Sequence, residues 1–165
     1  MLRKHLLLLL VLVMACGDSG ANAQPPADTP LSFPTIGEQV QIPPLPALDT
    51  ASVAVGQVLY AAHCATCHGV DLRGDPNWQI PNEDGSYLPP PQDSSGHTWH
   101  HSDQLLVDII LNGSNFAESQ MEPFAGVLTE EEVVSILDYF KSTWGPLERD
   151  VQWGATVRDA AVNSS

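Results

Sequence analysis

Residues 64–68 read Cys-Ala-Thr-Cys-His, the C-x-x-C-H pattern of c-type haem attachment. The spacing follows from the chemistry, because each thiol adds to one of two haem vinyl groups on the same edge of the macrocycle. The two cysteines must therefore lie on one turn of backbone. The histidine that follows can place an imidazole nitrogen on one axial face of the iron. The pattern predicts one covalently bound haem c, held by Cys64, Cys67 and His68.

Three other interpretations of the cysteine pair explain less. Structural zinc needs four ligands, usually from two such pairs, and the only other cysteine is Cys16. A thioredoxin-like redox motif expects a βαβ context, whereas residues 51–65 have a helical pattern with no apolar strand before them. A plain disulfide would leave the histidine at position 68 unexplained.

The N-terminus has the organisation of an export signal. A basic stretch over residues 1–5 precedes an apolar run from Leu6 to Ala15. Ten helical residues span roughly 15 Å, about half of a bilayer core, so the run is too short to cross a membrane. Residues 1–15 are therefore predicted to form a signal peptide. Export agrees with the haem motif, because haem c is attached on the outer side of the bacterial membrane.

Two cleavage sites compete behind the apolar run. Val13-Met14-Ala15-Cys16 resembles a bacterial lipobox, in which Cys16 becomes the lipidated first residue. Ala21-Asn22-Ala23 is an A-x-A site that would release a soluble protein beginning at Gln24. We favour the lipoprotein, because Cys16 directly follows the apolar run and has no evident partner elsewhere.

The mature chain is expected to have three parts. Residues 16–49 are rich in Pro, Ala, Ser, Thr and Gln and lack a sustained helical or strand period, which predicts a semi-extended tether. Residues 50–145 are expected to form the domain. Residues 146–165 are small and polar, and we expect them to form a frayed or adjunct C-terminal tail.

Three helices are predicted from apolar spacing and from cap signals. They are expected over residues 51–65, 102–111 and 129–143. Thr50 or Ser52 is expected to cap the first helix, and Thr129 with Glu132 forms a capping box before the third. Residues 70–93 carry many Gly and Pro residues and little helical signal. A loop of this length is unusual in a compact domain unless it wraps a large apolar group.

The long loop and the residues just after it contain several candidates for haem contact. The side chains that could either cover the haem edge or pack in the core are Trp78, Tyr87, Leu88 and Trp99. A backbone carbonyl of Pro90 or Pro91 is expected to accept the free N–H of the His68 imidazole and to fix its tautomer.

Met121 is the candidate for the second axial ligand. Because Met1 and Met14 fall in the signal peptide, Met121 is the only methionine of the mature chain. It lies in a loop between two predicted helices, where a thioether sulfur suits the free axial face of the iron. Such ligation would fill the coordination sphere and raise the reduction potential. The alternative is that Met121 fills a gap in the core.

A group of histidines at residues 97–101 is a second source of possible ligands. His97, His100 and His101 have no carboxylate or cysteine at ligand spacing. A surface position or a contact with a haem propionate is therefore a more common role for such a group than metal binding. One of them would be the next candidate if Met121 were not a ligand.

The charge of the chain limits its partners. It has 20 acidic and 6 basic side chains, and two of the basic ones, Arg3 and Lys4, would be lost with the signal peptide. The resulting negative electrostatic field disfavours binding to nucleic acid and to anionic membrane surfaces. It favours a redox partner with a basic docking face, mainly by speeding encounter. The only membrane attachment expected is a lipid on Cys16.

Residues 51–145 resemble the class I cytochromes c, which are small monohaem electron carriers, and in particular a bacterial subset that is periplasmic or lipid-anchored. Outside the haem motif the resemblance is carried by Gly56–Tyr60, Met121–Phe124 and Ile136-x-x-Tyr139. It implies an all-α cytochrome c-like fold, with three main helices and long loops wrapped around one haem. It also implies that the first and last helices cross at Gly56, with Tyr60 and Tyr139 packed nearby. Glu122 departs from the family, which often has proline directly after the ligand methionine.

The sequence therefore predicts a protein that carries single electrons between extracytoplasmic partners. Its haem is expected to be six-coordinate, with one histidine and one methionine ligand. No catalytic residue is expected. Two alternatives stay open at this point. One is a peroxidase-like haem enzyme or sensor with an open or displaceable sixth ligand, in which a residue such as His100 takes part. The other is the haem subunit of a larger oxidoreductase complex.

Overall fold

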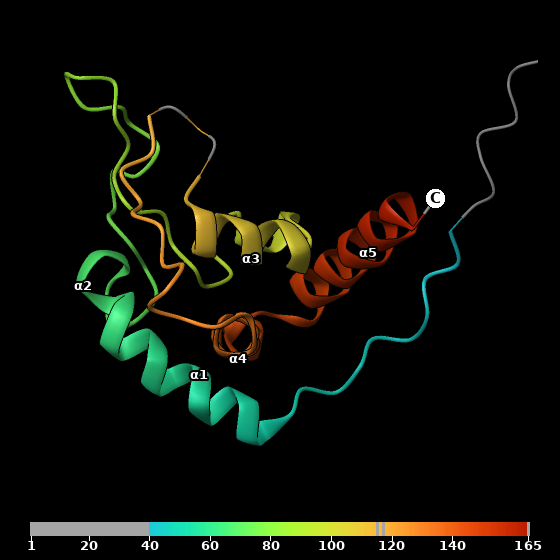
Figure 1. The fold of residues 1–165 in the computed structure, drawn as a ribbon. Helices are drawn as coiled ribbons and strands as arrows, with labels where there is room; N and C mark the ends of the chain where they lie inside the picture. The colour runs from blue at the N-terminus through green and yellow to red at the C-terminus, as the bar shows by residue number, and fades with distance from the viewer. Residues whose placement is uncertain (1–39, 115, 117, 165) are drawn as a thin grey trace, which may run out of the picture. The chain divides into compact units, whose positions relative to one another are not determined.

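The computed structural model describes residues 40–114, 116 and 118–164. The predictions that fall on residues 1–39 lie outside this part of the chain: the signal peptide, both cleavage sites, Cys16 and most of the tether. The helical elements are α1 (Thr50–His63), α2 (Ala65–His68), the 3-10 turn η1 (Thr98–His100), α3 (Asp103–Asn112), α4 (Glu130–Thr143) and α5 (Pro146–Asn163) (Figure 1). No strand occurs among the described residues, and the all-α prediction is confirmed.

The helix starts were predicted with one error. Asp49, and not Thr50 or Ser52, caps α1, and its carboxylate accepts a hydrogen bond from the Ala51 N–H at 2.9 Å. A carboxylate there also interacts favourably with the positive end of the helix dipole. The capping box of Thr129 and Glu132 at the start of α4 is present as predicted.

The first and last helices of the predicted domain, α1 and α4, cross at Gly56. A Cβ atom on this residue would lie 1.8 Å from the Ser135 carbonyl oxygen, so the two helix backbones are in direct contact. One turn along α1, the Tyr60 ring lies 5.5 Å from the Tyr139 ring and 5.7 Å from the Phe140 ring, centroid to centroid. This is the crossing that the family resemblance implied. Only glycine allows so close an approach.

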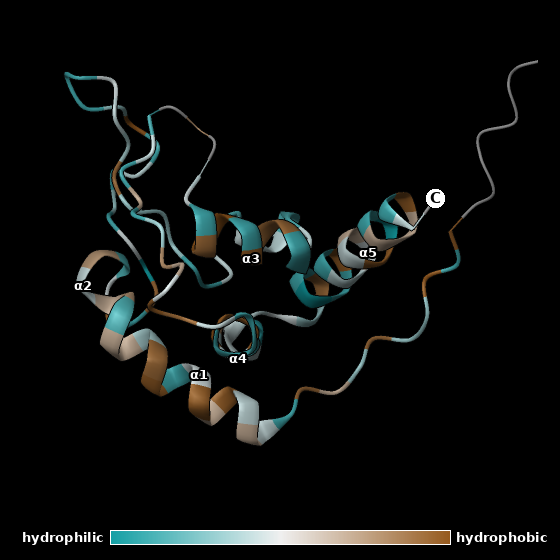
Figure 2. Ribbon diagram, viewed as in Figure 1, coloured by the Kyte–Doolittle hydropathy of each residue, from teal (hydrophilic) through white to brown (hydrophobic). Residues whose placement is uncertain are grey.

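The core forms where α1 and α3 each pack on α4. Hydrophobic and hydrophilic residues alternate along α1 and α3 (Figure 2), as in helices that bury one face. The buried side chains on these helices are Tyr60, Leu106, Val107, Ile110, Val133, Ile136, Leu137 and Phe140. Cys64, at the end of α1, is partly buried against this cluster. The core therefore holds the end of α1 that carries the haem motif.

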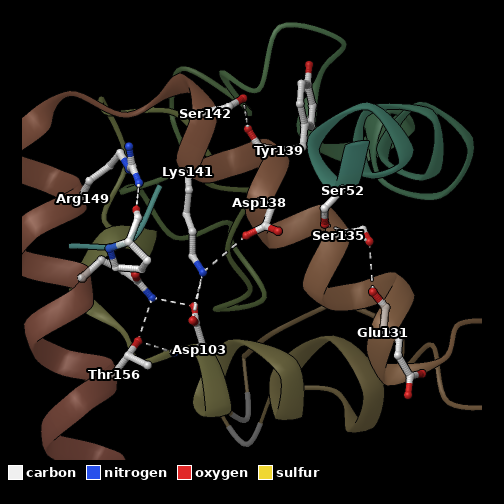
Figure 3. Close-up of polar contacts among 12 residues, drawn as sticks. Ser52, Asp103, Glu131, Ser135, Asp138, Tyr139, Lys141, Ser142, Arg149 and Thr156 are labelled. Atoms are coloured by element: carbon white, nitrogen blue, oxygen red, sulfur yellow. Dashed lines mark hydrogen bonds and ion pairs between the residues drawn. The ribbon is translucent and has the colours of Figure 1, made fainter. Parts of the chain in front are cut away.

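The C-terminal tail, expected to be frayed or adjunct, is not frayed, because residues 146–163 form the helix α5, which packs on η1 and α3. Polar contacts join it to Asp103 at the start of α3 (Figure 3). Gln152 Nε2 donates to Asp103 Oδ1 at 2.7 Å, and Asp103 N–H donates to Thr156 Oγ1 at 3.0 Å. Lys141 of α4 pairs with the same Asp103 carboxylate at 2.8 Å. One carboxylate at the start of α3 thus joins three helices.

The part of the predicted tether nearest the domain lies along α5. Trp153 Nε1 donates to the Pro43 carbonyl oxygen at 2.8 Å, and the Arg149 guanidinium donates to the Pro46 carbonyl oxygen at 2.9 Å. Prolines lack an N–H but keep this acceptor, so a proline-rich segment can still be held by side-chain donors. The segments that flank the predicted domain therefore contact each other.

The crossing can be tested with two glycine-to-alanine substitutions. Gly56→Ala should lower the free energy of unfolding by about 3 kcal/mol or more, because backbone atoms of α4 must move away from the new methyl group. Gly154→Ala in α5 is the matched control, since its Cβ would meet only the flexible end of Arg158, at 3.3 Å. It should leave stability unchanged or raise it by up to about 1 kcal/mol. Guanidinium unfolding followed by circular dichroism measures both, and equal effects would contradict the crossing.

Candidate haem site

The cysteine motif forms a tight turn at the end of α1. Cys64 closes that helix, and its carbonyl oxygen accepts hydrogen bonds from the backbone N–H groups of Cys67 at 3.1 Å and His68 at 2.9 Å. Gly69 leaves the turn with φ of 78°, a backbone conformation that glycine adopts readily. The Tyr60 hydroxyl donates to the Gly69 carbonyl oxygen at 2.6 Å. These contacts place two thiols and one imidazole on adjacent positions of a fixed turn.

The two thiols differ in their surroundings. Both are free; Cys64 is partly buried and Cys67 is exposed. Burial, and next the nearby Cys67, raises the pKa of the Cys64 thiol to about 11. Burial therefore disfavours the thiolate form of Cys64.

The His68 imidazole is held by the long loop. Its Nδ1 lies 2.9 Å from the Pro90 carbonyl oxygen, which confirms one of the two proline acceptors expected. An Nδ1–H donated to this oxygen leaves the Nε2 lone pair free to bind a metal. Burial lowers the pKa of His68, and the bond to Pro90 opposes that shift. Burial thus favours the neutral form of the ring, which is the form that binds a metal.

The loop that presents Pro90 is fixed by backbone hydrogen bonds. Gly74 N–H donates to the His68 carbonyl oxygen at 2.8 Å, Asp75 N–H to that of Pro89 at 2.9 Å, and Gln92 N–H to that of Leu72 at 2.7 Å. Residues 70–93 contain no helix or strand, as the sequence predicted. The loop nevertheless has a defined path next to the haem motif.

Met121 lies in the loop between α3 and α4, partly buried against the hydrophobic core. The loop is attached to the end of α3, because Phe124 N–H donates to the Ile110 carbonyl oxygen at 3.0 Å and Ala125 N–H to that of Leu111 at 2.8 Å. Both predicted roles of Met121, iron ligand and core filler, are compatible with this position.

The histidines at 97–101 are engaged in ring contacts. His97 stacks on Trp78 with 5.2 Å between ring centroids, and His101 meets His97 edge-on at 5.4 Å. His100 stacks on Trp99 at 3.7 Å. The pKa values of His97 and His101 are lowered, first by burial and then by neighbouring imidazoles.

A conventional metal site is not found in the part of the chain that the structure describes. There, no three His, Cys, Asp or Glu side chains come together in a way that could hold a metal ion.

Gln92 is a residue that the sequence analysis missed. It is buried, and its side-chain amide lies 3.1 Å from His68 Nδ1 and 2.8 Å from the Thr98 hydroxyl. The Trp144 indole N–H donates to its backbone carbonyl at 2.8 Å. Nothing in the local sequence marks Gln92, because its partners are distant along the chain.

The family model for cytochrome c oxidase, cbb3-type, subunit III, matches residues 51–140. The match covers more than half of the chain, and the protein belongs to this family of c-type cytochromes. No curated protein and no solved structure matches it significantly.

Family membership confirms the cytochrome c-like fold and a covalently bound haem c, and it assigns the protein to haem-based electron transfer. Cytochrome c domains of this type are extracytoplasmic. Among the helices that the structure describes, none has the length and apolar character needed to span a bilayer. The turn at 64–68 fits the cofactor, since it offers two free thiols and a neutral imidazole whose Nδ1 is already engaged.

Proposed function

We propose that the protein is a one-electron carrier in which Cys64 and Cys67 would hold the haem covalently and His68 and Met121 would bind its iron. The observation that carries the proposal is the bond between His68 Nδ1 and the Pro90 carbonyl oxygen, which leaves Nε2 of a neutral imidazole available. When bound, the haem supplies an iron that alternates between the ferrous and ferric states.

In this proposal the polypeptide orients the two side chains that would bind the iron. Pro90 fixes the direction of the His68 ring and increases its basicity as a ligand. The loop attached to α3 carries Met121. Binding of its thioether to the iron would leave no coordination position open for a substrate. No acid, base or nucleophile of the chain is assigned a catalytic step.

The acidic charge of the chain and its proposed tether both support exchange of electrons with other proteins. The chain carries 20 acidic against 6 basic side chains, so a partner with a basic docking face would be attracted over a distance. Within the proposed organisation, the domain of residues 50–145 is carried by a tether over residues 16–49. A tether would keep the domain at high local concentration near membrane-bound partners.

The proposed ligand set predicts a specific spectroscopic result. The ferric wild-type protein should show the sulfur-to-iron charge-transfer band, and the reduced protein should not bind carbon monoxide. Met121→Ala should lose the band and bind carbon monoxide, because it opens one axial position. Glu122→Gln, next to it and exposed, is the control and should behave as the wild type. Absorption spectra of the matured proteins measure all of these outcomes.

Two results would contradict this ligand set. Ready binding of carbon monoxide by the wild-type protein would favour the haem enzyme or sensor. If the wild-type haem is six-coordinate but lacks the charge-transfer band, the second ligand would be His97, His100 or His101 instead of Met121.

A second candidate function is favoured by the family match. The family is described as a subunit of a cytochrome c oxidase, so the chain could be the haem subunit of a larger oxidoreductase complex rather than a free carrier. Purification from native membranes in mild detergent separates these functions. A free carrier elutes alone, whereas a subunit elutes with its complex.

We also propose that Cys16 carries a lipid that anchors the protein. The support is its position directly after the apolar run in Val13-Met14-Ala15-Cys16. Mass spectrometry of the membrane fraction should find a mature N-terminus at Cys16 with attached acyl chains, and Cys16→Ala should release the protein from that fraction. A wild-type N-terminus at Gln24 would contradict the anchor.

A further inference from the structure

The side chain of Gln92 occupies a closed position beside the proposed haem ligand. The residue is 9 % exposed, and its amide group lies between the His68 ring, the Pro90 carbonyl and the Thr98 hydroxyl. Its backbone is fixed separately, by the Leu72 carbonyl and the Trp144 indole. The amide is therefore held next to His68 by contacts that a change of its own side chain would leave in place.

Hydrogen-bond chemistry restricts how this amide can face His68. If Nε2 of His68 binds iron, Nδ1 carries the hydrogen and can only donate. An amide nitrogen facing Nδ1 would then set two donors against each other at 3.1 Å. The oxygen and nitrogen of a glutamine amide exchange places by a half-turn of the group, and the hydrogen-bond network decides between the two orientations.

With its oxygen toward His68, the Gln92 amide loses the 3.4 Å contact of its nitrogen with the Pro90 carbonyl oxygen and bonds to its other two neighbours. The oxygen accepts from the His68 Nδ1–H, which it shares with the Pro90 carbonyl. The amide nitrogen then donates to the Thr98 hydroxyl, which lies 3.5 Å from the Pro91 carbonyl oxygen and can donate to it in turn. The result is an unbroken series of donors and acceptors from His68 to η1.

We propose that Gln92 is a positioning residue, whose side-chain oxygen is a second acceptor for the His68 Nδ1–H and lowers the reduction potential of the haem. This inference rests on the proposed role of His68 as an axial ligand. A second acceptor draws the Nδ1 hydrogen away from the ring and makes the imidazole a stronger donor to iron. A stronger donor favours the ferric state, so the potential falls.

Two substitutions at the same position test the proposal. Gln92→Leu removes the acceptor at similar volume and should shift the potential to a more positive value. Gln92→Glu restores an oxygen there and should return the potential to the wild-type value or below it. Thr98→Val removes the group that orients the amide, and it should shift the potential in the same direction as Gln92→Leu but by less. Potentiometric titration of the matured proteins gives the potentials.

A second measurement separates this role from a purely structural one. In the ferrous protein the proton NMR signal of the His68 Nδ1–H should move upfield in Gln92→Leu and stay near the wild-type position in Gln92→Glu. The proposal is overturned if Gln92→Leu leaves both the potential and this signal unchanged, or if Gln92→Glu shifts the potential upward as Gln92→Leu does. A wild-type protein without His68 ligation would instead refute the proposed function.

Discussion

The contact between α1 and α4 at Gly56 is the constraint on which the haem site depends. It holds α1 against the core, and the haem motif follows at the end of that helix. Tyr60, one turn beyond Gly56, packs on aromatic rings of α4 and also donates its hydroxyl to the Gly69 carbonyl oxygen. The same helix crossing therefore fixes the backbone on both sides of the Cys-x-x-Cys-His turn, before any side chain meets the haem.

The sequence predicted those features whose signals are local or specific. The capping box of Thr129 and Glu132 lies within four residues, and the haem motif lies within five. The proline acceptor for His68 was predicted because a ligand histidine needs a partner for its second nitrogen, and the loop offered Pro90 and Pro91. The cap of α1 was predicted at Thr50 or Ser52 instead of Asp49 because all three residue types can serve as caps.

The features that the sequence did not predict depend on partners far along the chain. The helix α5 lacks a strong apolar stripe, and Gln152, which holds it, bonds to Asp103 at the start of α3. In the sequence, Gln92 is likewise only one polar residue in a proline-rich loop. Its relation to His68 appears only when that loop is folded back to bring Thr98 and Trp144 around it. Polar contacts of this kind leave no periodic pattern for sequence analysis to detect.

The most direct test of this account is the location of the haem in the mature protein. Proteolysis followed by mass spectrometry should find one haem on the peptide that contains residues 64–68, with both Cys64 and Cys67 resistant to alkylation under denaturing conditions. This result is predicted because the turn presents two thiols to one edge of the macrocycle beside His68. A peptide without haem, in which both cysteines are alkylated, would contradict the account.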